Sequence, residues 1–298
     1  MLDRFLAARG PFRFDLALRY YRSSPSTIAE VVDERSYRRA FRAPAGPAVL
    51  TAVGADGGLR VAVAGPGGDE AGLAQASVLV GRAFGLGDDA RGLVAAAARD
   101  GALAERLRRY LGLRPLAIPD PFEALVWAIL GQQINVAFAA RLKRVLLERY
   151  GPAVEVGGRA FRLFPGPDRL ADVGPEELRP LQFSRQKALY LGELARAIVD
   201  GRVDLEALRA RADDEVVAEI TRLKGIGRWT AEYLLLRGFG RSDAIPAGDM
   251  GLRAIVGRLD GLGRNATEAE VRTAAEPFAP YRGYLAMALW FALQQREY

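Results

Sequence analysis

Residues 221–253 decide the fold that we expect, and they read TRLKGIGRWTAEYLLLRGFGRSDAIPAGDMGLR. The stretch begins with a tight turn, Leu223-Lys224-Gly225-Ile226-Gly227, between two helical patterns. Glycine permits a positive φ and the close approach of another backbone. The N–H groups of such a turn, beside the positive end of the next helix, can cradle a phosphate. An ordinary helix–helix turn can have the same residues, so the turn alone leaves both interpretations open.

Asp249 closes the same stretch, directly before a helical run that starts at Met250. An aspartate in this position is often only the N-cap of its helix. The helix N-terminus also favours the ionised carboxylate. Asp249 is therefore a candidate catalytic group as well as a candidate cap.

The composition restricts the chemistry that the chain can perform. Its 298 residues carry a formal net charge of +6, which suits a polyanionic partner, and half of them are hydrophobic. The absence of cysteine and histidine excludes disulfides, thiolate zinc sites, iron–sulfur clusters and Ser-His-Asp catalysis. Catalysis must then use carboxylate, amine, hydroxyl or backbone groups. The start of the chain does not resemble a signal peptide and no apolar run could span a membrane, so we expect a cytoplasmic protein.

The first part of the chain, residues 1–90, has the patterns of a small α+β domain. Residues 12–20 alternate strictly between apolar and other side chains, which predicts a half-buried strand. Two short strands at 48–53 and 59–64 enclose an Asp-Gly-Gly turn and predict an antiparallel hairpin. A helix is expected at 69–85. No chemical motif lies in this part, and we expect it to serve packing.

Residues 91–298 have mainly helical patterns. A helix begins well at residues 120–123, with aspartate as N-cap, proline next and glutamate three residues after the cap. The pattern breaks at Gly131-Gln132-Gln133 and resumes to residue 151. One interpretation of this break is a helix joint whose amides bind backbone ends. A short strand pair is expected within 152–164, and helices follow. The fold class that we expect is α+β, with a small antiparallel-sheet domain before an all-α unit.

Together these segments resemble a known family. The string LKGIGRWTAEYLLLRGFG followed by Asp249 is similar to the helix-hairpin-helix, Gly/Pro-rich, Asp superfamily of DNA glycosylases, of the AlkA type (DNA-3-methyladenine glycosylase II). AILGQQINVAFAARL at 128–142 resembles the family segment that enters the DNA stack, and YRGYLAMALW at 281–290 resembles its C-terminal helix. The resemblance implies two helical lobes, one of residues 113–239 and one of residues 91–112 plus 240–298.

The resemblance also implies roles for single residues. Asp249 matches the catalytic aspartate, and Trp229, Tyr233 and Trp290 match positions that line the base pocket. Trp229 stands where bifunctional members have a Schiff-base lysine. We therefore expect a monofunctional enzyme that leaves the abasic site uncut. The other candidate amines, those of Lys187 and Lys224, do not match the family position.

Further roles follow for the glycine turn and for the helix joint. The residues expected to hold a DNA phosphate are Gly225 and Gly227 through their amides and Lys224 and Arg228 through their charge. The backbone carbonyls that match a structural Na⁺ or K⁺ site of the superfamily are those of Thr221, Leu223 and Ile226. Gln133 stands where the best-known type of the family has an apolar wedge that fills the gap left by the flipped base, and Ile134 is the alternative wedge.

The chemistry of alkylated bases fits these residue types. An enzyme must take a base out of the stack to reach its glycosidic bond. Alkylation makes a purine cationic, and tryptophan and tyrosine faces attract a cation by about 0.5–2 kcal/mol. A carboxylate stabilises the oxocarbenium-like sugar and can activate water. We therefore expect a monomeric hydrolase of N-glycosyl bonds that releases 3-methyladenine or 7-methylguanine from duplex DNA in bacterial cytoplasm and requires no cofactor. The alternatives are a glycosylase for hypoxanthine, uracil or an oxidised purine, and a non-catalytic protein that binds damaged DNA.

Overall fold

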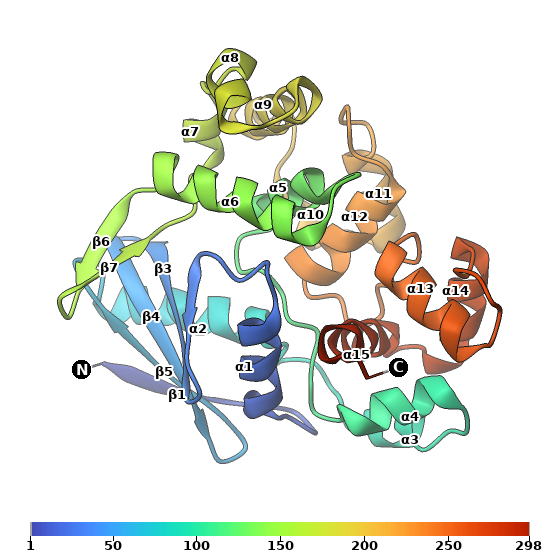
Figure 1. Cartoon of the computed structure of the whole chain (residues 1–298). Helices are drawn as coiled ribbons and strands as arrows, with labels where there is room; N and C mark the ends of the chain where they lie inside the picture. The colour runs from blue at the N-terminus through green and yellow to red at the C-terminus, as the bar shows by residue number, and fades with distance from the viewer. Residues whose placement is uncertain (1, 298) are drawn as a thin grey trace.

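A five-stranded antiparallel sheet forms the N-terminal side of the computed structural model, which describes residues 2–297 (Figure 1). The strand order is β1-β5-β4-β3-β2. The strands are β1 (Asp3–Ala7), β2 (Glu30–Val32), β3 (Ser36–Ala43), β4 (Gly46–Ala55) and β5 (Gly58–Ala64). The hairpin expected at 48–53 and 59–64 is confirmed as β4 and β5, which pair from Ala55 with Gly58 through a turn in which Gly57 has φ +70°.

The prediction of a strand at residues 12–20 is wrong, because this segment forms the helix α1 (Phe14–Ser23). Its buried side chains include those at positions 14, 17, 18 and 21, which is the spacing of one face of a helix. The buried side chains at positions 16 and 20 widen this face and produce the alternation that resembled a strand. Ala17 and Tyr21 were the residues that distinguished the two periods.

Helix α2 (Glu70–Ala83) packs on one face of the sheet and confirms the helix expected at 69–85. The core under it is aromatic, with the Tyr37 and Phe84 rings 5.2 Å apart. The other face of the sheet contacts a two-stranded hairpin, β6 (Ala153–Val156) and β7 (Arg159–Arg162), through Val49 and Phe161. The strand pair expected within 152–164 is thus confirmed. It forms a separate two-stranded sheet that packs against the N-terminal sheet.

The remaining chain is helical (Figure 1). Before the glycine turn come α3 (Leu93–Ala97), α4 (Ala102–Arg109), α5 (Pro121–Gly131), α6 (Val136–Tyr150), α7 (Pro167–Ala171), α8 (Pro175–Leu178), the 3₁₀ turn η1 (Arg179–Leu181), α9 (Arg185–Val199), α10 (Leu205–Arg209) and α11 (Asp213–Ile220). After it come α12 (Arg228–Tyr233), the π-helical turn η2 (Leu234–Gly238), α13 (Met250–Leu259), α14 (Glu268–Ala275), the 3₁₀ turn η3 (Glu276–Phe278) and α15 (Arg282–Gln295). Asp120 caps α5 as expected, accepting from the Phe122 N–H at 2.9 Å.

A buried cluster of four charges joins the sheet to the helices. Arg39 of β3 pairs with Glu30 of β2 and with Glu123 of α5, and the Lys143 amine of α6 lies 2.7 Å from Glu123. Burial raises the pKa of Glu123, but Arg39 and Lys143 together hold it below its usual range. Two positive and two negative groups balance, so the cluster fixes α5 and α6 against the sheet.

One apolar core runs through both the sheet side and the helical side of the chain. Helix α15 lies at its centre, and it contacts α1, α4 and α13. The domain limits expected at residues 90, 112 and 239 stay predictions. Within residues 2–297, no helix combines the length and the apolar character needed to cross a membrane.

Candidate active site and nucleic-acid interface

The Asp249 carboxylate caps α13 and also contacts an aromatic side chain. Its Oδ1 accepts from the Leu252 N–H at 3.0 Å and from the Trp290 indole N–H at 2.9 Å. Both bonds end on the same oxygen, and within residues 2–297 none reaches Oδ2. Asp249 is half-buried. The cap function and a chemical function are therefore compatible, because capping uses one oxygen and leaves the other available.

The three aromatic residues expected in the base pocket lie together beside this carboxylate. The Trp229 and Tyr233 rings are 5.7 Å apart, and the Tyr233 and Trp290 rings are 6.2 Å apart. Tyr233 is buried, and burial raises the pKa of its hydroxyl well above the ordinary value, so it stays neutral. Trp229 and Trp290 are only partly buried. Helices α12 and α15 thus supply flat electron-rich faces next to Asp249.

Gly251 is a feature of this site that the sequence interpretation missed. A Cβ at Gly251 would lie 3.1 Å from Asp249 Oδ1 and 3.1 Å from Leu293 Cδ1. The glycine therefore lets α13 begin close to α15. Its signal was a glycine in the first turn of a helix, where it costs about 1 kcal/mol relative to alanine and so indicates close packing.

The glycine turn connects α11 to α12, and its two glycines differ. Gly225 has φ +88°, and a Cβ there would lie 2.2 Å from Tyr190 Cδ2 of α9. Gly227 has φ −94° and is the N-cap of α12, with open space where a Cβ would be. The Ile226 N–H binds the Leu223 carbonyl at 3.1 Å, whereas the N–H groups of both glycines have no partner within residues 2–297. Two donors thus remain available for an anion at the start of α12.

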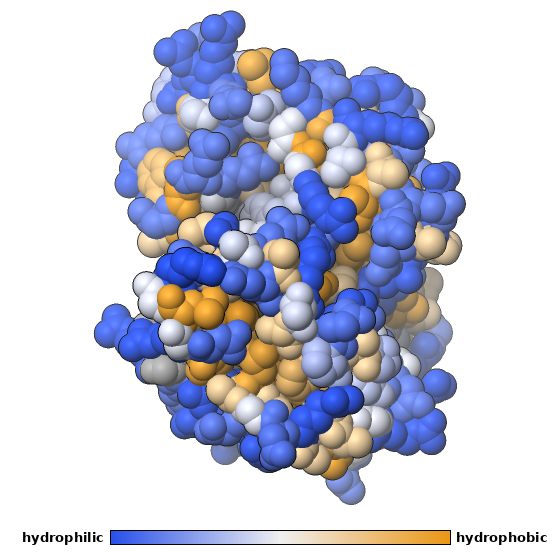
Figure 2. All heavy atoms as spheres, turned by 90° about the vertical axis from the view of Figure 1, so that its right-hand side faces the viewer, coloured by the Kyte–Doolittle hydropathy of each residue, from blue (hydrophilic) through white to orange (hydrophobic). Residues whose placement is uncertain are grey.

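Two cationic side chains flank this turn. Lys224 and Arg228 are both exposed. Arg228 Nε lies 2.8 Å from the buried Glu232 carboxylate, which Arg272 of α14 also contacts at 2.6 Å. Glu232 therefore orients Arg228 and leaves its terminal nitrogens free to reach outward. The face that carries α11, α13 and α14 is largely hydrophilic, with apolar patches between (Figure 2).

The carbonyls expected to hold a monovalent cation belong to the same turn. The Leu223 carbonyl accepts the Ile226 N–H, and no hydrogen bond from residues 2–297 reaches the carbonyl of Thr221 or Ile226. Carbonyl oxygens suit Na⁺ or K⁺, so these residues fit such an ion. In the described part of the chain, no group of three or more acidic side chains could hold a metal instead.

The joint between α5 and α6 separates its two glutamines. The Gln132 side chain donates to the Gly225 carbonyl at 2.8 Å. The prediction that the amides of this joint bind backbone groups is therefore confirmed for Gln132. Gln133 is exposed, with a left-handed φ of +58°. Ile134 is half-buried and packs against the core. Of the two wedge candidates, Gln133 is the more exposed, and Gln132 ties the joint between α5 and α6 to the glycine turn.

Lys187 has a structural role at the same joint. Its amine donates to the carbonyls of Ile129 and Gln132 at 2.9 and 2.7 Å, where α5 ends. Burial lowers the pKa of Lys187. The amine is thus committed to satisfying the last carbonyls of a helix.

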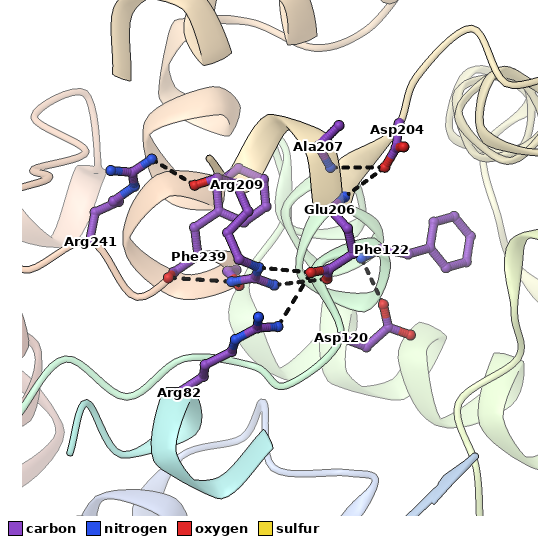
Figure 3. A network of polar contacts seen from close by, with 10 residues as sticks. Arg82, Asp120, Phe122, Asp204, Glu206, Ala207, Arg209, Phe239 and Arg241 are labelled. Carbon is purple, nitrogen blue, oxygen red and sulfur yellow. Dashed lines mark hydrogen bonds and ion pairs between the residues drawn. The ribbon is translucent and has the colours of Figure 1, made fainter. Parts of the chain in front are cut away.

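Polar contacts also anchor the chain after η2, on the way to Asp249 (Figure 3). Arg209 of α10 donates to the Gly238 and Phe239 carbonyls at 3.2 and 3.4 Å. Glu206 contacts Arg209 and also Arg82 of α2. These contacts connect the end of η2 to both α10 and α2.

The chain is similar to known proteins in both sequence and fold. A family model described as HhH-GPD superfamily base excision DNA repair protein matches residues 126–280. The chain is 33% identical over 210 residues to a DNA-3-methyladenine glycosylase of Bacillus subtilis, covering 70% of this chain and 69% of that protein. It superposes on a 3-methyladenine DNA glycosylase of Archaeoglobus fulgidus with a TM-score of 0.84 and 26% identity, over 98% of both chains. A 3-methyladenine DNA glycosylase of Schizosaccharomyces pombe in complex with abasic DNA matches with a TM-score of 0.57 and 27% identity, over 70% of this chain and 98% of that one.

Proposed function

The chain belongs to the HhH-GPD superfamily of base excision DNA repair proteins, and we propose that it hydrolyses the glycosidic bond of alkylated purines in duplex DNA. One observation supports this more than any other. Asp249, with one oxygen held by Leu252 and Trp290, stands beside three aromatic faces at the start of a helix. The proposal also fits relatives named for release of 3-methyladenine.

Binding would begin at the glycine turn. The N–H groups of Gly225 and Gly227 hold a phosphate, and Lys224 and Arg228 add charge that does not depend on base sequence. A cation on the carbonyl side of the turn would stiffen it and add positive charge beside the phosphate. Gln133 enters the duplex and occupies the space of the base that has left the stack. Damaged duplex DNA is thus the proposed partner of a monomer, in the cytoplasm.

The flipped base would stack among Trp229, Tyr233 and Trp290, which attract a cationic ring. The C1′–N bond breaks, and its electron pair moves to the base nitrogen and neutralises the cationic base. The Asp249 carboxylate stabilises the positive sugar through Oδ2. The oxygen of a water molecule bonds to C1′, and its proton passes to Asp249 and then to solvent.

The product would be an uncut abasic site. Strand cleavage by a Schiff base requires an amine at the sugar, and Trp229 occupies that position of bifunctional enzymes. Lys187 is bound by two carbonyls at the end of α5, and Lys224 is on the exposed turn. We therefore expect borohydride to trap no covalent complex with the damaged strand.

Release of 3-methyladenine and 7-methylguanine from alkylated duplex DNA tests the proposal. Asp249→Asn keeps a cap but removes the charge, so the rate should fall by about 100-fold or more while DNA binding survives. Asp260→Asn, at the other end of α13, is the matched control and should keep full activity. Equal release by Asp249→Asn and the parent protein would overturn the assignment.

A further inference from the structure

Buried charged side chains in residues 2–297 have clear partners, with one exception. Arg39, Glu123, Lys143 and Glu232 bind opposite charges, and Arg114 and Lys187 bind backbone carbonyls. Arg237 is 3% exposed, and its guanidinium binds only the Tyr20 hydroxyl at 2.8 Å and the Met287 sulfur at 3.6 Å. Its Nε has no partner in the described part of the chain. A buried cation without an acid is costly, which suggests a use.

The position of Arg237 places this charge against the base pocket. It lies in the π-helical turn η2, and such turns often occur at functional sites. Its Cζ is 6.0 Å from the centroid of the Trp290 ring, and Trp290 is the residue that contacts both Asp249 and Tyr233. A guanidinium does not lose its proton in proteins. A permanently charged guanidinium therefore already lies beside the Trp290 ring, which would stack on the base.

This charge acts in opposite directions on two kinds of damaged base. A cationic alkylated purine is repelled by a like charge nearby. Arg237 already interacts with the Trp290 ring and so weakens the attraction of that ring for a second cation. A neutral damaged purine leaves the sugar with the electron pair of the broken bond and becomes negative. A buried cation beside the pocket stabilises that negative charge as it develops.

We propose that Arg237, acting through Trp290, shifts the preference of the enzyme away from cationic alkylated purines and toward neutral damaged purines. Arg237 is thus a specificity-determining residue that positions charge without touching the reacting atoms. Tyr20 of α1 contacts the guanidinium through its hydroxyl and its ring, but the charge belongs to Arg237 alone. The inference rests on the proposed glycosylase function and adds a residue to it.

The test compares kcat/KM for 7-methylguanine, which is cationic in DNA, with kcat/KM for hypoxanthine, which is neutral. Arg237→Gln should raise the ratio of the first to the second by about tenfold, because the repulsion and the stabilisation are both lost. Arg237→Lys keeps the charge and should keep the ratio close to that of the parent protein. A merely structural role would lower both rates together and leave the ratio unchanged.

Met287→Glu gives a second route that leaves Arg237 in place. The new carboxylate would lie within reach of the guanidinium, since Met287 Sδ is 3.6 Å from it, and would neutralise its charge. The ratio should rise as in Arg237→Gln. Tyr20→Phe is the matched control, because it removes a hydrogen bond to Arg237 and keeps the charge, so the ratio should hold.

The outcomes separate the inference from the proposed function. If the parent protein releases neither base nor any other alkylated purine, the glycosylase function itself fails. If it releases 7-methylguanine but no hypoxanthine, or if the ratio is unchanged in both Arg237→Gln and Met287→Glu, the role of Arg237 is overturned and the function stands.

Discussion

The Trp290 indole N–H and the Leu252 backbone N–H converge on one oxygen of Asp249, at 2.9 and 3.0 Å. Two donors hold Oδ1, and Oδ2 accepts no hydrogen bond within residues 2–297. In the proposed function Trp290 therefore does two things, since it orients the carboxylate through its nitrogen and its ring faces the flipped base. A single helix, α15, carries both functions.

Trp290→Phe separates these two functions, because phenylalanine keeps a flat ring and loses the donor. A hydrogen bond to a charged group contributes about 1.5–3 kcal/mol, so kcat should fall by about tenfold or more with little change in KM. Single-turnover release of 7-methylguanine measures this. Trp229→Phe is the matched control, because the Trp229 indole nitrogen has no partner within residues 2–297. Equal loss of kcat in both variants would contradict the role of the nitrogen.

The sequence supported those parts of the fold and site that depend on neighbouring residues. The helix start at Asp120, the hairpin of β4 and β5, and a helix beginning after Asp249 all follow from short patterns with a physical cause. The family resemblance added the grouping of Trp290 with the distant Tyr233 and Asp249. The α1 error arose in a segment where two periods fitted the same apolar residues.

Contacts between distant segments were beyond the sequence patterns. Gln132 binds Gly225, Lys187 caps α5, and Arg237 reaches Tyr20. In each case the partner is fixed only when two helices pack together. Polar residues in helix joints, such as Gln132, were the available signal, and they do not identify their partners.

Gly225→Ala tests why the turn needs glycine. Alanine would have to adopt φ +88° and place its Cβ 2.2 Å from Tyr190 Cδ2, so the free energy of unfolding should fall by about 2 kcal/mol or more. Urea unfolding measures this. Gly227→Ala has φ −94° and open space for its Cβ, so it should lose only about 1 kcal/mol, the cost of a poorer N-cap, and yet bind DNA less tightly. Tyr190→Ala should recover part of the loss in Gly225→Ala, and no recovery would contradict the steric cause.

The two glutamines of the α5–α6 joint should respond differently to substitution. Gln132→Ala cuts the bond to the Gly225 carbonyl and should lower stability by about 1 kcal/mol and weaken DNA binding. Gln133→Gly relieves a left-handed φ of +58° and should leave stability equal or higher. It should nevertheless slow base flipping, measured as the fluorescence change of a 2-aminopurine beside the lesion. Normal flipping by Gln133→Gly, with impaired flipping by Ile134→Gly, would identify Ile134 as the wedge.

Acid should weaken the protein through the buried charge cluster. The pKa of Glu123 is held below its ordinary value of 4.5 by Arg39 and Lys143, so the ionised form stabilises the fold above the unfolded-state pKa. That contribution is lost as the pH falls through the folded-state pKa. Glu123→Gln should cost about 3–5 kcal/mol at neutral pH and flatten the acid limb of the stability curve. Unfolding in urea between pH 7 and pH 3 measures both, and the exposed Glu34→Gln should leave the acid limb unchanged.

The charges at the glycine turn should determine how salt affects DNA binding. Each phosphate contact contributes about 0.9 to the slope of log affinity against log salt, so Arg228→Gln and Lys224→Gln should each reduce the slope by about one. Glu232→Gln keeps the charge of Arg228 but loosens its orientation, since it weakens the 2.8 Å contact. This variant should retain the slope and lower the selectivity for damaged over intact duplex.

Arg202→Gln is the matched control for these charge changes, because Arg202 lies beyond the far end of α9 and pairs with Glu193. Its affinity and slope should equal those of the parent protein at every salt concentration. Fluorescence anisotropy on an abasic duplex and on the matching intact duplex measures all four variants under one protocol. A slope that changes as much in Arg202→Gln as in Arg228→Gln would mean that overall charge, and not a phosphate held at the glycine turn, governs binding.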